Sequence, residues 1–280
     1  ASPVGSPIAG TGVSICFPPM SIAGTYSIVA VNATTGCSSN MSGTATISVN
    51  PLPTAYTISG GGSYCTGGSG VHVGLPFSNS GVSYQLYNTG VPVPGGLVVG
   101  TGGALDFGAI TTPGSYSIVG TNTTTGCTNG MAGAVSVSIN PLPSVFSVNG
   151  GGNFCAGGAG VAVGLSNSST GINYQLYNGG SPVGGLVAGT GMPLNFGLQT
   201  TLGTYTVLAI NSATGCTQYM SGSATVVVDP LPVVYAVTGG GNYCVGGSGV
   251  DVALNGSDAG ISYRLYYAGP PMGAPLAGTG

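Results

Sequence analysis

The chain repeats itself, and this internal repeat limits its possible folds more than any single residue does. The phrase Asn-x-x-Thr-Gly-Cys occurs three times, ending at Cys37, Cys127 and Cys216, so 90 and then 89 residues separate successive copies. A second phrase, Gly-Gly-Gly followed two residues later by an aromatic residue and a cysteine, ends at Cys65, Cys155 and Cys244. A fixed period of this kind marks a tandem array. The period suits a small, independently folded β-sandwich.

Pro-Leu-Pro recurs in the same register and divides the array into modules, at 51–53, 141–143 and 230–232. We therefore expect complete modules at 54–140 and 144–229. Residues 1–50 match the C-terminal half of a module, and 233–280 match the N-terminal half. We expect the chain either to continue beyond both ends or to complete a sandwich with the next copy.

Short runs in which apolar residues alternate with polar ones predict the strands of a module. In 54–140 the apolar members of these runs are Tyr56 and Ile58; Val71, Val73 and Leu75; Val82, Tyr84 and Leu86; Leu105 and Phe107; Tyr116 and Ile118; and Val135, Val137 and Ile139. A Pro- and Gly-rich loop is expected at 90–104. Roughly seven short strands with turns between them predict an all-β fold of tandem immunoglobulin-like Greek-key sandwiches. No helical periodicity is present.

Only 2% of the residues are charged, and this limits the partners of the chain. Without basic patches, nucleic acid and anionic membrane surfaces are poor partners, and no apolar run is long enough for a membrane-spanning helix. Net charge normally keeps molecules apart. We therefore expect the chain to associate with itself, end to end or laterally.

The seven cysteines indicate an oxidising, extracellular setting. Pairing within modules, as Cys65–Cys127 and Cys155–Cys216, is the simplest scheme. However, the two cysteine-bearing turns of a Greek-key sandwich lie at opposite ends, about 17–20 Å apart, whereas a disulfide needs Cα atoms within about 7 Å. A bond between neighbouring modules, Cys65–Cys216, is therefore an alternative, and Cys127–Cys155 is a third. Cys16 stands outside the repeat and is expected to be a buried thiol rather than an intermolecular link.

Tyrosines recur at two positions of the module. The first set follows Gly-Thr or Gly-Ser and is expected to form tyrosine corners, in which the hydroxyl bonds to upstream backbone; its members are Tyr26, Tyr116 and Tyr205. The second set is expected to point outward, for contact with other modules or with a ligand; its members are Tyr87, Tyr177 and Tyr266.

Residues for catalysis and metal binding are sparse. Four scattered Asp residues do not supply the six to eight oxygens of a calcium site, and the cysteine spacing does not match zinc motifs. His72 is not repeated, since Ala162 and Asp251 stand at its position, so we interpret it as a surface residue. The glycine tracts lack the helix and basic residue of phosphate loops. We expect no cofactor and no enzymatic activity.

Four phrases together resemble a known class of repeat. Cys-x-Gly-Gly-x-Gly-Val, Gly-Thr-Tyr-Ser/Thr, Thr-Gly-Cys and Val-Asn-Pro-Leu-Pro are similar to the Ig-like repeats of giant secreted surface proteins of Bacteroidetes, including gliding-motility-associated adhesins. The resemblance implies export through a type IX system and a role as a cell-surface adhesin or fibre. The first hypothesis is therefore a filament or stalk of modules. The alternatives are an adhesin that binds surface glycans through outward tyrosines and the 88–104 loop, and a spacer of a larger secreted enzyme.

Overall fold

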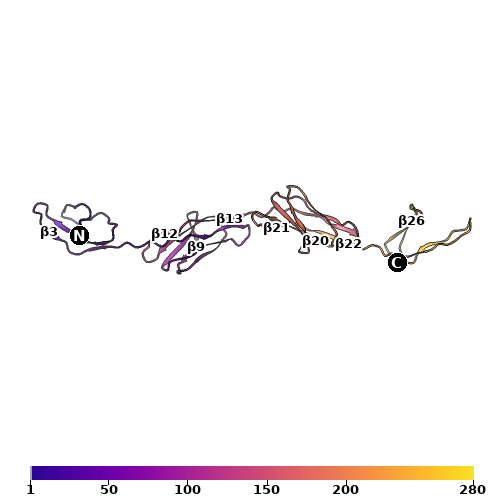
Figure 1. Cartoon of the computed structure of the whole chain (residues 1–280), viewed down its shortest axis with the longest axis horizontal. Coiled ribbons are helices and arrows are strands. Elements are labelled where there is room, and N and C mark those ends of the chain that lie inside the picture. Colours follow the sequence, from indigo (N-terminus) through magenta and orange to yellow (C-terminus); the bar gives the residue numbers. More distant parts are fainter. Residues whose placement is uncertain (1) are drawn as a thin grey trace. The chain divides into compact units, whose positions relative to one another are not determined.

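The computed structural model describes residues 2–280, among which every regular element is a β-strand. The chain divides into two compact units, one ending at Ile139 and the other beginning at Asn140. Each unit holds one complete β-sandwich and a shorter set of paired strands (Figure 1). The prediction of an all-β chain of immunoglobulin-like sandwiches is confirmed.

The two complete modules have the same order of strands. In the first they are β5 (Ser59–Gly60), β6 (Gly62–Cys65), β7 (Val71–Leu75), β8 (Val82–Asn88), β9 (Val91–Val99), β10 (Leu105–Ile110), β11 (Gly114–Asn122), β12 (Thr128–Gly130) and β13 (Val135–Asn140). In the second they are β14 (Val148–Gly150), β15 (Gly152–Cys155), β16 (Val161–Leu165), β17 (Ile172–Asn178), β18 (Ser181–Ala188), β19 (Leu194–Gln199), β20 (Gly203–Asn211), β21 (Thr217–Tyr219) and β22 (Ala224–Asp229).

Each sandwich consists of a small sheet and a large sheet. In the first module the small sheet has the order β10-β7-β5, and the large sheet has the order β6-β13-β11-β8-β9 with β12 beside β11. The second module repeats this as β14-β16-β19 and β15-β22-β20-β17-β18, with β21 beside β20. In immunoglobulin lettering these are sheets A-B-E and A′-G-F-C-C′.

Shorter strands form at the two flanks of the chain. They are β1 (Gly24–Tyr26), β2 (Val29–Val31), β3 (Ser38–Asn40) and β4 (Ala45–Ile47) on one side, and β23 (Val237–Gly239), β24 (Val252–Leu254), β25 (Ser262–Tyr266) and β26 (Pro271–Ala277) on the other. They pair only two by two. Residues equivalent to the core are exposed there: Val252, which matches the fully buried Val73, is 51% exposed.

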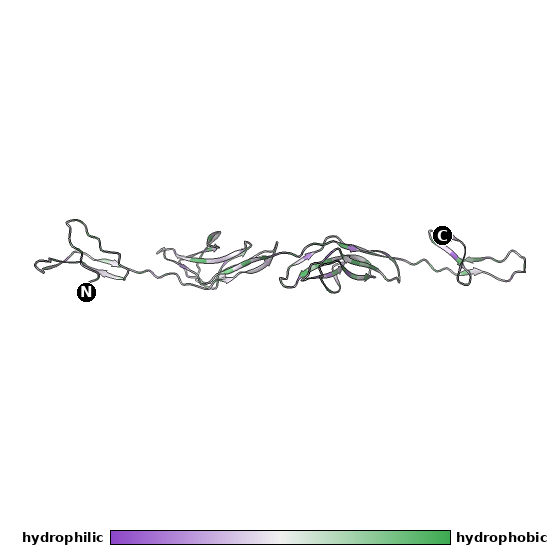
Figure 2. Cartoon of the chain, turned by 90° about the horizontal axis from the view of Figure 1, so that it is seen from above, coloured by the Kyte–Doolittle hydropathy of each residue, from purple (hydrophilic) through white to green (hydrophobic). Residues whose placement is uncertain are grey.

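Each complete module has its own hydrophobic core between the two sheets. Hydrophobic residues, green in Figure 2, follow the strands of both sandwiches. In the first module most of the inward positions expected from the alternation are buried, and Val73, Leu86 and Ile118 are each at most 1% exposed. Tyr56, Val71, Phe107 and Val135 are partly buried and pack against this core. Burying one such side chain contributes about 1.5–3 kcal/mol.

Ile139 was expected to share the inward face with Val135 and Val137, and this prediction is wrong. Ile139 is exposed. The register pairs β13 with β11 only as far as Gly114↔Val137, so the last residues of β13 extend beyond the strand that would help to cover them.

The Gly-Gly-Gly tract is the point at which strand A passes from one sheet to the other. β5 pairs with β7 in the small sheet, whereas β6 lies beside β13 in the large sheet. Gly60 and Gly61 have φ angles of 90° and 73°. A Cβ on Gly60 would overlap the carbonyl oxygen of His72, and one on Gly61 would lie 2.9 Å from that of Ser136. Only glycine fits this close approach of three backbones.

The segment 90–104, which was expected to be a loop, instead contains the edge strand β9. β8 and β9 form a tight hairpin in which Asn88 pairs with Val91. The two turn residues, Thr89 and Gly90, both have positive φ, as a type I′ turn requires. The prolines and glycines of β9 are tolerated because it lies at the edge of its sheet and carries a bulge there.

A glutamine side chain fills the bulge between strands C and C′. Gln175 is 8% exposed, and its Nε2 donates to the carbonyl oxygens of Leu176 and Val183, both at 3.0 Å. Gln85 makes the equivalent bonds to Leu86 and Val93. Simple alternation along strand C would place this side chain on the outer face, but in the two complete modules it is buried or half-buried. At the flank, the exposed Arg264 occupies the equivalent position.

Candidate functional site

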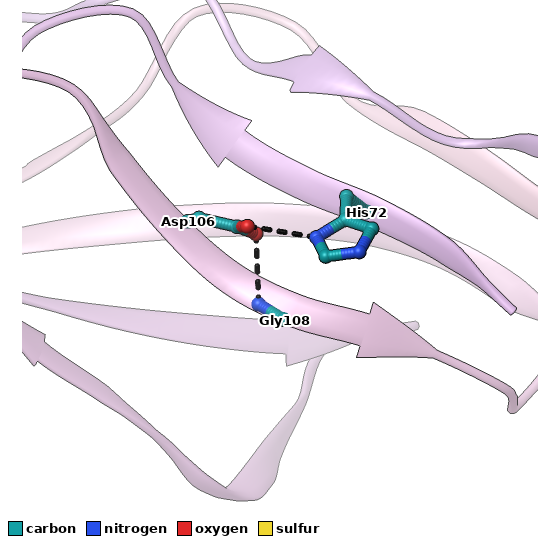
Figure 3. A network of polar contacts seen from close by, with 3 residues as sticks. All are labelled: His72, Asp106 and Gly108. Atoms are coloured by element: carbon teal, nitrogen blue, oxygen red, sulfur yellow. Dashed lines mark hydrogen bonds and ion pairs between the residues drawn. The ribbon is translucent and has the colours of Figure 1, made fainter. Parts of the chain in front are cut away.

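His72 and Asp106 form the one ion pair among the residues that the structure describes. Asp106 Oδ2 lies 2.7 Å from His72 Nδ1, and both side chains are mostly exposed. Figure 3 shows them projecting from the neighbouring strands β7 and β10. Asp106 Oδ1 also accepts a hydrogen bond from the Gly108 amide at 2.8 Å. That bond, together with His72, holds the pKa of Asp106 below its ordinary value, although partial burial opposes this.

The second module shows that this pair serves local structure. Asn195 replaces Asp106 and accepts the same bond from the Gly197 amide at 2.8 Å, while Ala162 replaces His72. The side-chain oxygen thus fixes the irregular start of strand E in both copies, with or without a histidine. Across residues 2–280, His, Cys, Asp and Glu nowhere gather in a group of three that could hold a metal ion.

The Gly-Thr/Ser-Tyr tyrosines make the bonds that define a tyrosine corner. The hydroxyls of Tyr26, Tyr116 and Tyr205 donate to the carbonyl oxygens of the residues four positions upstream, each at 2.7 Å. Tyr116 and Tyr205 are 1% exposed, and burial raises the pKa of Tyr116. Tyr116 and Tyr205 pack inside their sandwiches, and the three tyrosines have a structural role.

The second set of tyrosines lies on strand C, on the face that alternates with the core. Tyr87 and Tyr177 are half-buried, opposite Pro92 and Pro182 of the neighbouring edge strand. Tyr266, at the flank, is exposed. In the complete modules this arrangement leaves only part of each ring for contact with another molecule.

The recurring phrase Asn-x-x-Thr-Gly-Cys forms a compact turn after strand F. In the second module the Asn211 side chain accepts hydrogen bonds from the Ala213 and Thr214 amides, at 3.0 and 3.3 Å. The Asn211 amide donates to the Cys216 carbonyl oxygen at 2.9 Å, and Gly215 has a φ of 74°. The same bonds form around Asn122 and Cys127. The phrase therefore holds a cysteine at a fixed place at one end of each module.

Two of the seven cysteines, Cys65 and Cys216, are disulfide-bonded. The other five are free thiols, namely Cys16, Cys37, Cys127, Cys155 and Cys244. The pairings Cys65–Cys127, Cys155–Cys216 and Cys127–Cys155 are therefore wrong for this structure, because each needs a cysteine that is a thiol. The expectation of a buried Cys16 is also wrong, since Cys16 is exposed.

The geometry of the second module explains why a bond inside one module fails. Cys155 pairs in register with Asp229 at the C-terminal end of the module, in the parallel ladder of β15 and β22. β20 begins beside Val226 of β22 and runs away from the C-terminal end of the module to Asn211. The Asn211 amide donates a hydrogen bond to the Cys216 carbonyl oxygen, so Cys216 lies near the far end of β20. Its nine residues span about 27 Å, far more than the roughly 7 Å that a disulfide allows between Cα atoms.

Shallow depressions occur beside the tyrosine corners. The one in the second module has a volume of about 500 Å³, and Tyr205, Val183 and Leu198 are among the residues that line it. The corresponding one in the first module has about 270 Å³ and is lined in part by Tyr116 and Pro94. In the second module the one aromatic ring in the lining is Tyr205, whose hydroxyl the corner already uses, whereas in the first module Phe107 lines the depression together with Tyr116.

No helix in residues 2–280 is long and apolar enough to cross a membrane. No family model matches the chain, and no curated protein matches it.

Similar solved structures include immunoglobulin and fibronectin-like domains. The ligand-binding domain of human OSCAR is 14% identical, with 64% of this chain and 100% of that chain covered and a TM-score of 0.27. The fibronectin(III)-like modules of Clostridium thermocellum CbhA are 10% identical, with 61% and 95% covered and a TM-score of 0.34. Immunoglobulin domains 1–5 of Sidekick-1 are 18% identical, with 77% and 48% covered and a TM-score of 0.34.

The immunoglobulin-like fold of this chain follows from the strand order of its own sheets. Domains of this fold are typical of extracellular structural and adhesion proteins, and a disulfide is typical of the same setting. The chain is a tandem array of immunoglobulin-like β-sandwich modules.

Proposed function

We propose that this chain is a structural, extracellular repeat protein whose modules associate with further copies to build a surface filament, fibre or adhesin stalk. Its role is mechanical rather than catalytic. The observation that carries the proposal is an edge strand with exposed apolar residues on a module that has almost no charge.

The edge strand β9 supports association with a second copy. It lies at the end of the large sheet, and its C-terminal part is regular, with Tyr84 paired to Val98. Leu97 and Val99 flank that position and are 60% and 64% exposed. Leu186 of β18 is likewise exposed in the second module. Edge strands of soluble proteins are usually protected by lysines, prolines or bulges. Here the prolines and the bulge protect only the first half of β9.

The composition favours the same partner. Four Asp, one Arg and one His provide all the ionisable side chains of 280 residues apart from cysteine and tyrosine, so little repulsion opposes contact between copies. Apolar edge residues bury area on association, and the Ser-, Thr- and Asn-rich exterior supplies hydrogen bonds. A second copy of this chain is therefore the occupant that we assign to the edge.

We further propose that the chain is displayed at the cell surface. The four repeated phrases resemble Ig-like repeats of secreted Bacteroidetes adhesins, and from this we infer surface display after export by a type IX system. The oxidised cysteines Cys65 and Cys216 support a location outside the reducing cytosol.

Glycan binding is the weaker candidate. Tyr87 and Tyr177 are only half-exposed, and the segment 88–104 that was expected to be a binding loop contains a strand. The depression beside Tyr205 offers no further aromatic ring on which a sugar could stack, and the one beside Tyr116 adds only Phe107, which packs against the core.

The experiment compares two variants that add the same charge at different places. Leu97→Lys puts an ammonium group on the edge strand, whereas Thr124→Lys puts it on the exposed turn after strand F. Electron microscopy should show ordered assemblies for the wild type and for Thr124→Lys. Leu97→Lys should need at least tenfold more protein to assemble, because pairing would bury the charge.

Two results would contradict the proposal. One is a wild-type chain that stays as single molecules at every concentration. The other is a Leu97→Lys variant that assembles as readily as Thr124→Lys. Binding of the monomeric wild type to a glycan array would favour the adhesin alternative instead.

A further inference from the structure

The positions of the cysteines within each module point to the linkers between modules. Cys155 lies beside Asp229, the residue that directly precedes Pro230-Leu231-Pro232, and the Ala156 amide donates to the Asp229 carbonyl oxygen at 2.8 Å. Cys65 has the same place in the first module, on β6 beside β13. Because β13 ends at Asn140, Cys65 borders the linker Pro141-Leu142-Pro143 from its N-terminal side.

The other repeated cysteine borders a linker from the opposite side. In the second module Ser147 and Ser221 form a parallel bridge. Five residues upstream of each stand Leu142 and Cys216, so the turn that holds Cys216 lies at the end where the linker enters the module. In the first module Asn129 Nδ2 donates to the Pro53 carbonyl oxygen at 2.8 Å, which places Cys127 at the corresponding end.

We infer that Cys65 and Cys216 are bonded to each other, and that this disulfide is a cross-link over a Pro-Leu-Pro linker that the repeat prescribes for every pair of consecutive modules. Both cysteines are disulfide-bonded, and the other five are thiols. They border the same three-residue linker, which spans about 10 Å when extended. Cys216 is fully buried, whereas Cys37, its equivalent at the flank, is exposed.

Pairing across the linkers between consecutive modules also explains why the other repeated cysteines are thiols. Cys127 would pair with the cysteine of a module before Pro51-Leu52-Pro53, and Cys155 with that of a module after Pro230-Leu231-Pro232. No cysteine occupies either of these positions between residues 1 and 280. Cys37 and Cys244 lack partners in this range for the same reason. Only a further copy of the module would supply them.

The chemistry of the bond is ordinary thiol oxidation. Each thiol gives up one proton, and the pair gives up two electrons as the sulfur–sulfur bond forms. A disulfide such as oxidised glutathione accepts them and is reduced to two thiols. The bond forms within one chain, so it does not depend on the assembly proposed above; a single, unassembled chain would also contain it.

The few aspartates of the chain allow a simple test. After the thiols of the intact, oxidised chain are alkylated, a protease that cuts before Asp yields fragments 1–105 and 106–228. The first contains Cys65 and the second contains Cys216. The inference predicts that the two fragments migrate as one species until a reductant separates them, and that mass spectrometry finds all cysteines alkylated except Cys65 and Cys216.

Four serine variants identify the bonded atoms. Cys65→Ser and Cys216→Ser should each abolish the linked species, whereas the controls Cys127→Ser and Cys155→Ser should retain it. The inference is overturned if the linked species is absent from the wild type, survives in Cys65→Ser or Cys216→Ser, or is lost in either control. If a variant fails to fold, the alkylation pattern of the wild type decides alone.

Discussion

At the scale of single residues, the repeated phrases specify turns and caps rather than reactive groups. Asn211 caps the turn after strand F, and Asn195 caps the start of strand E. In both, the side-chain oxygen accepts hydrogen bonds from backbone amides. Tyr205 anchors strand F through the carbonyl oxygen of Thr201. The repeat is therefore maintained by backbone geometry, which is equally important in every copy.

The tyrosine corner leads to a prediction at this scale. Tyr116→Phe removes a hydroxyl that donates to Thr112 and accepts from Asn88 Nδ2 at 3.2 Å, inside a well-packed site. Because both partners lose a hydrogen bond, we expect the free energy of unfolding to fall by about 1–2 kcal/mol. Urea unfolding followed by circular dichroism measures this.

Tyr87→Phe is the matched control, because Tyr87 lies on the outer face of strand C and is half-exposed. Its free energy of unfolding should stay within about 0.5 kcal/mol of that of the wild type. Equal decreases in the free energy of unfolding of Tyr116→Phe and Tyr87→Phe would contradict a stabilising role of the tyrosine-corner hydrogen bonds.

At the scale of elements, the alternation of apolar residues was sufficient to predict most strands. Val73, Leu86 and Ile118 could be placed in the core because one face of each strand is buried and the side chains alternate. The edge strand β9 could not be predicted. Its Pro92, Pro94 and paired glycines follow the composition of a loop, and only its position at a sheet edge makes them compatible with a strand.

The buried glutamine was missed for a related reason. Position 175 falls between two inward residues, so simple alternation assigns it to solvent. A bulge in the ladder between β17 and β18 instead leaves carbonyl oxygens that the Gln175 amide satisfies. The replacement of Gln by Arg264 at the flank concealed the pattern further.

The passage of strand A between the sheets gives a prediction at the element scale. Gly60→Ala would force a Cβ onto the His72 carbonyl oxygen at a φ of 90°. We expect the first module to lose at least about 2 kcal/mol of stability, because both the backbone strain and the overlap must be relieved.

Gly130→Ala is the control for Gly60→Ala. Gly130 also lies in a strand, but nothing stands within 4 Å of its added Cβ. Its thermal unfolding midpoint should stay close to that of the wild type, while that of Gly60→Ala falls by several degrees. Unchanged midpoints in both variants would contradict a role of the glycine tract in the sheet change.

At the scale of the whole molecule, the modules have separate cores, and short linkers join them. Proline fixes φ at two of the three linker positions, which restricts bending. A disulfide over the same linker would restrict it further. The sequence predicted the modules and their uncharged exterior, but it left the disulfide pairing open among three schemes, of which Cys65–Cys216 was one, because spacing alone does not decide between them.

The proposed filament depends on association between copies of the chain through apolar edge strands, which the nearly uncharged exterior does not oppose. Sedimentation velocity over a series of protein concentrations, at low and at high salt, tests it most directly. We expect the mean sedimentation coefficient to rise with concentration and to be the same or higher at high salt, because contacts made by apolar edges and hydrogen bonds leave almost no charge to screen. A coefficient that stays at the single-chain value, or association that salt abolishes, would contradict it.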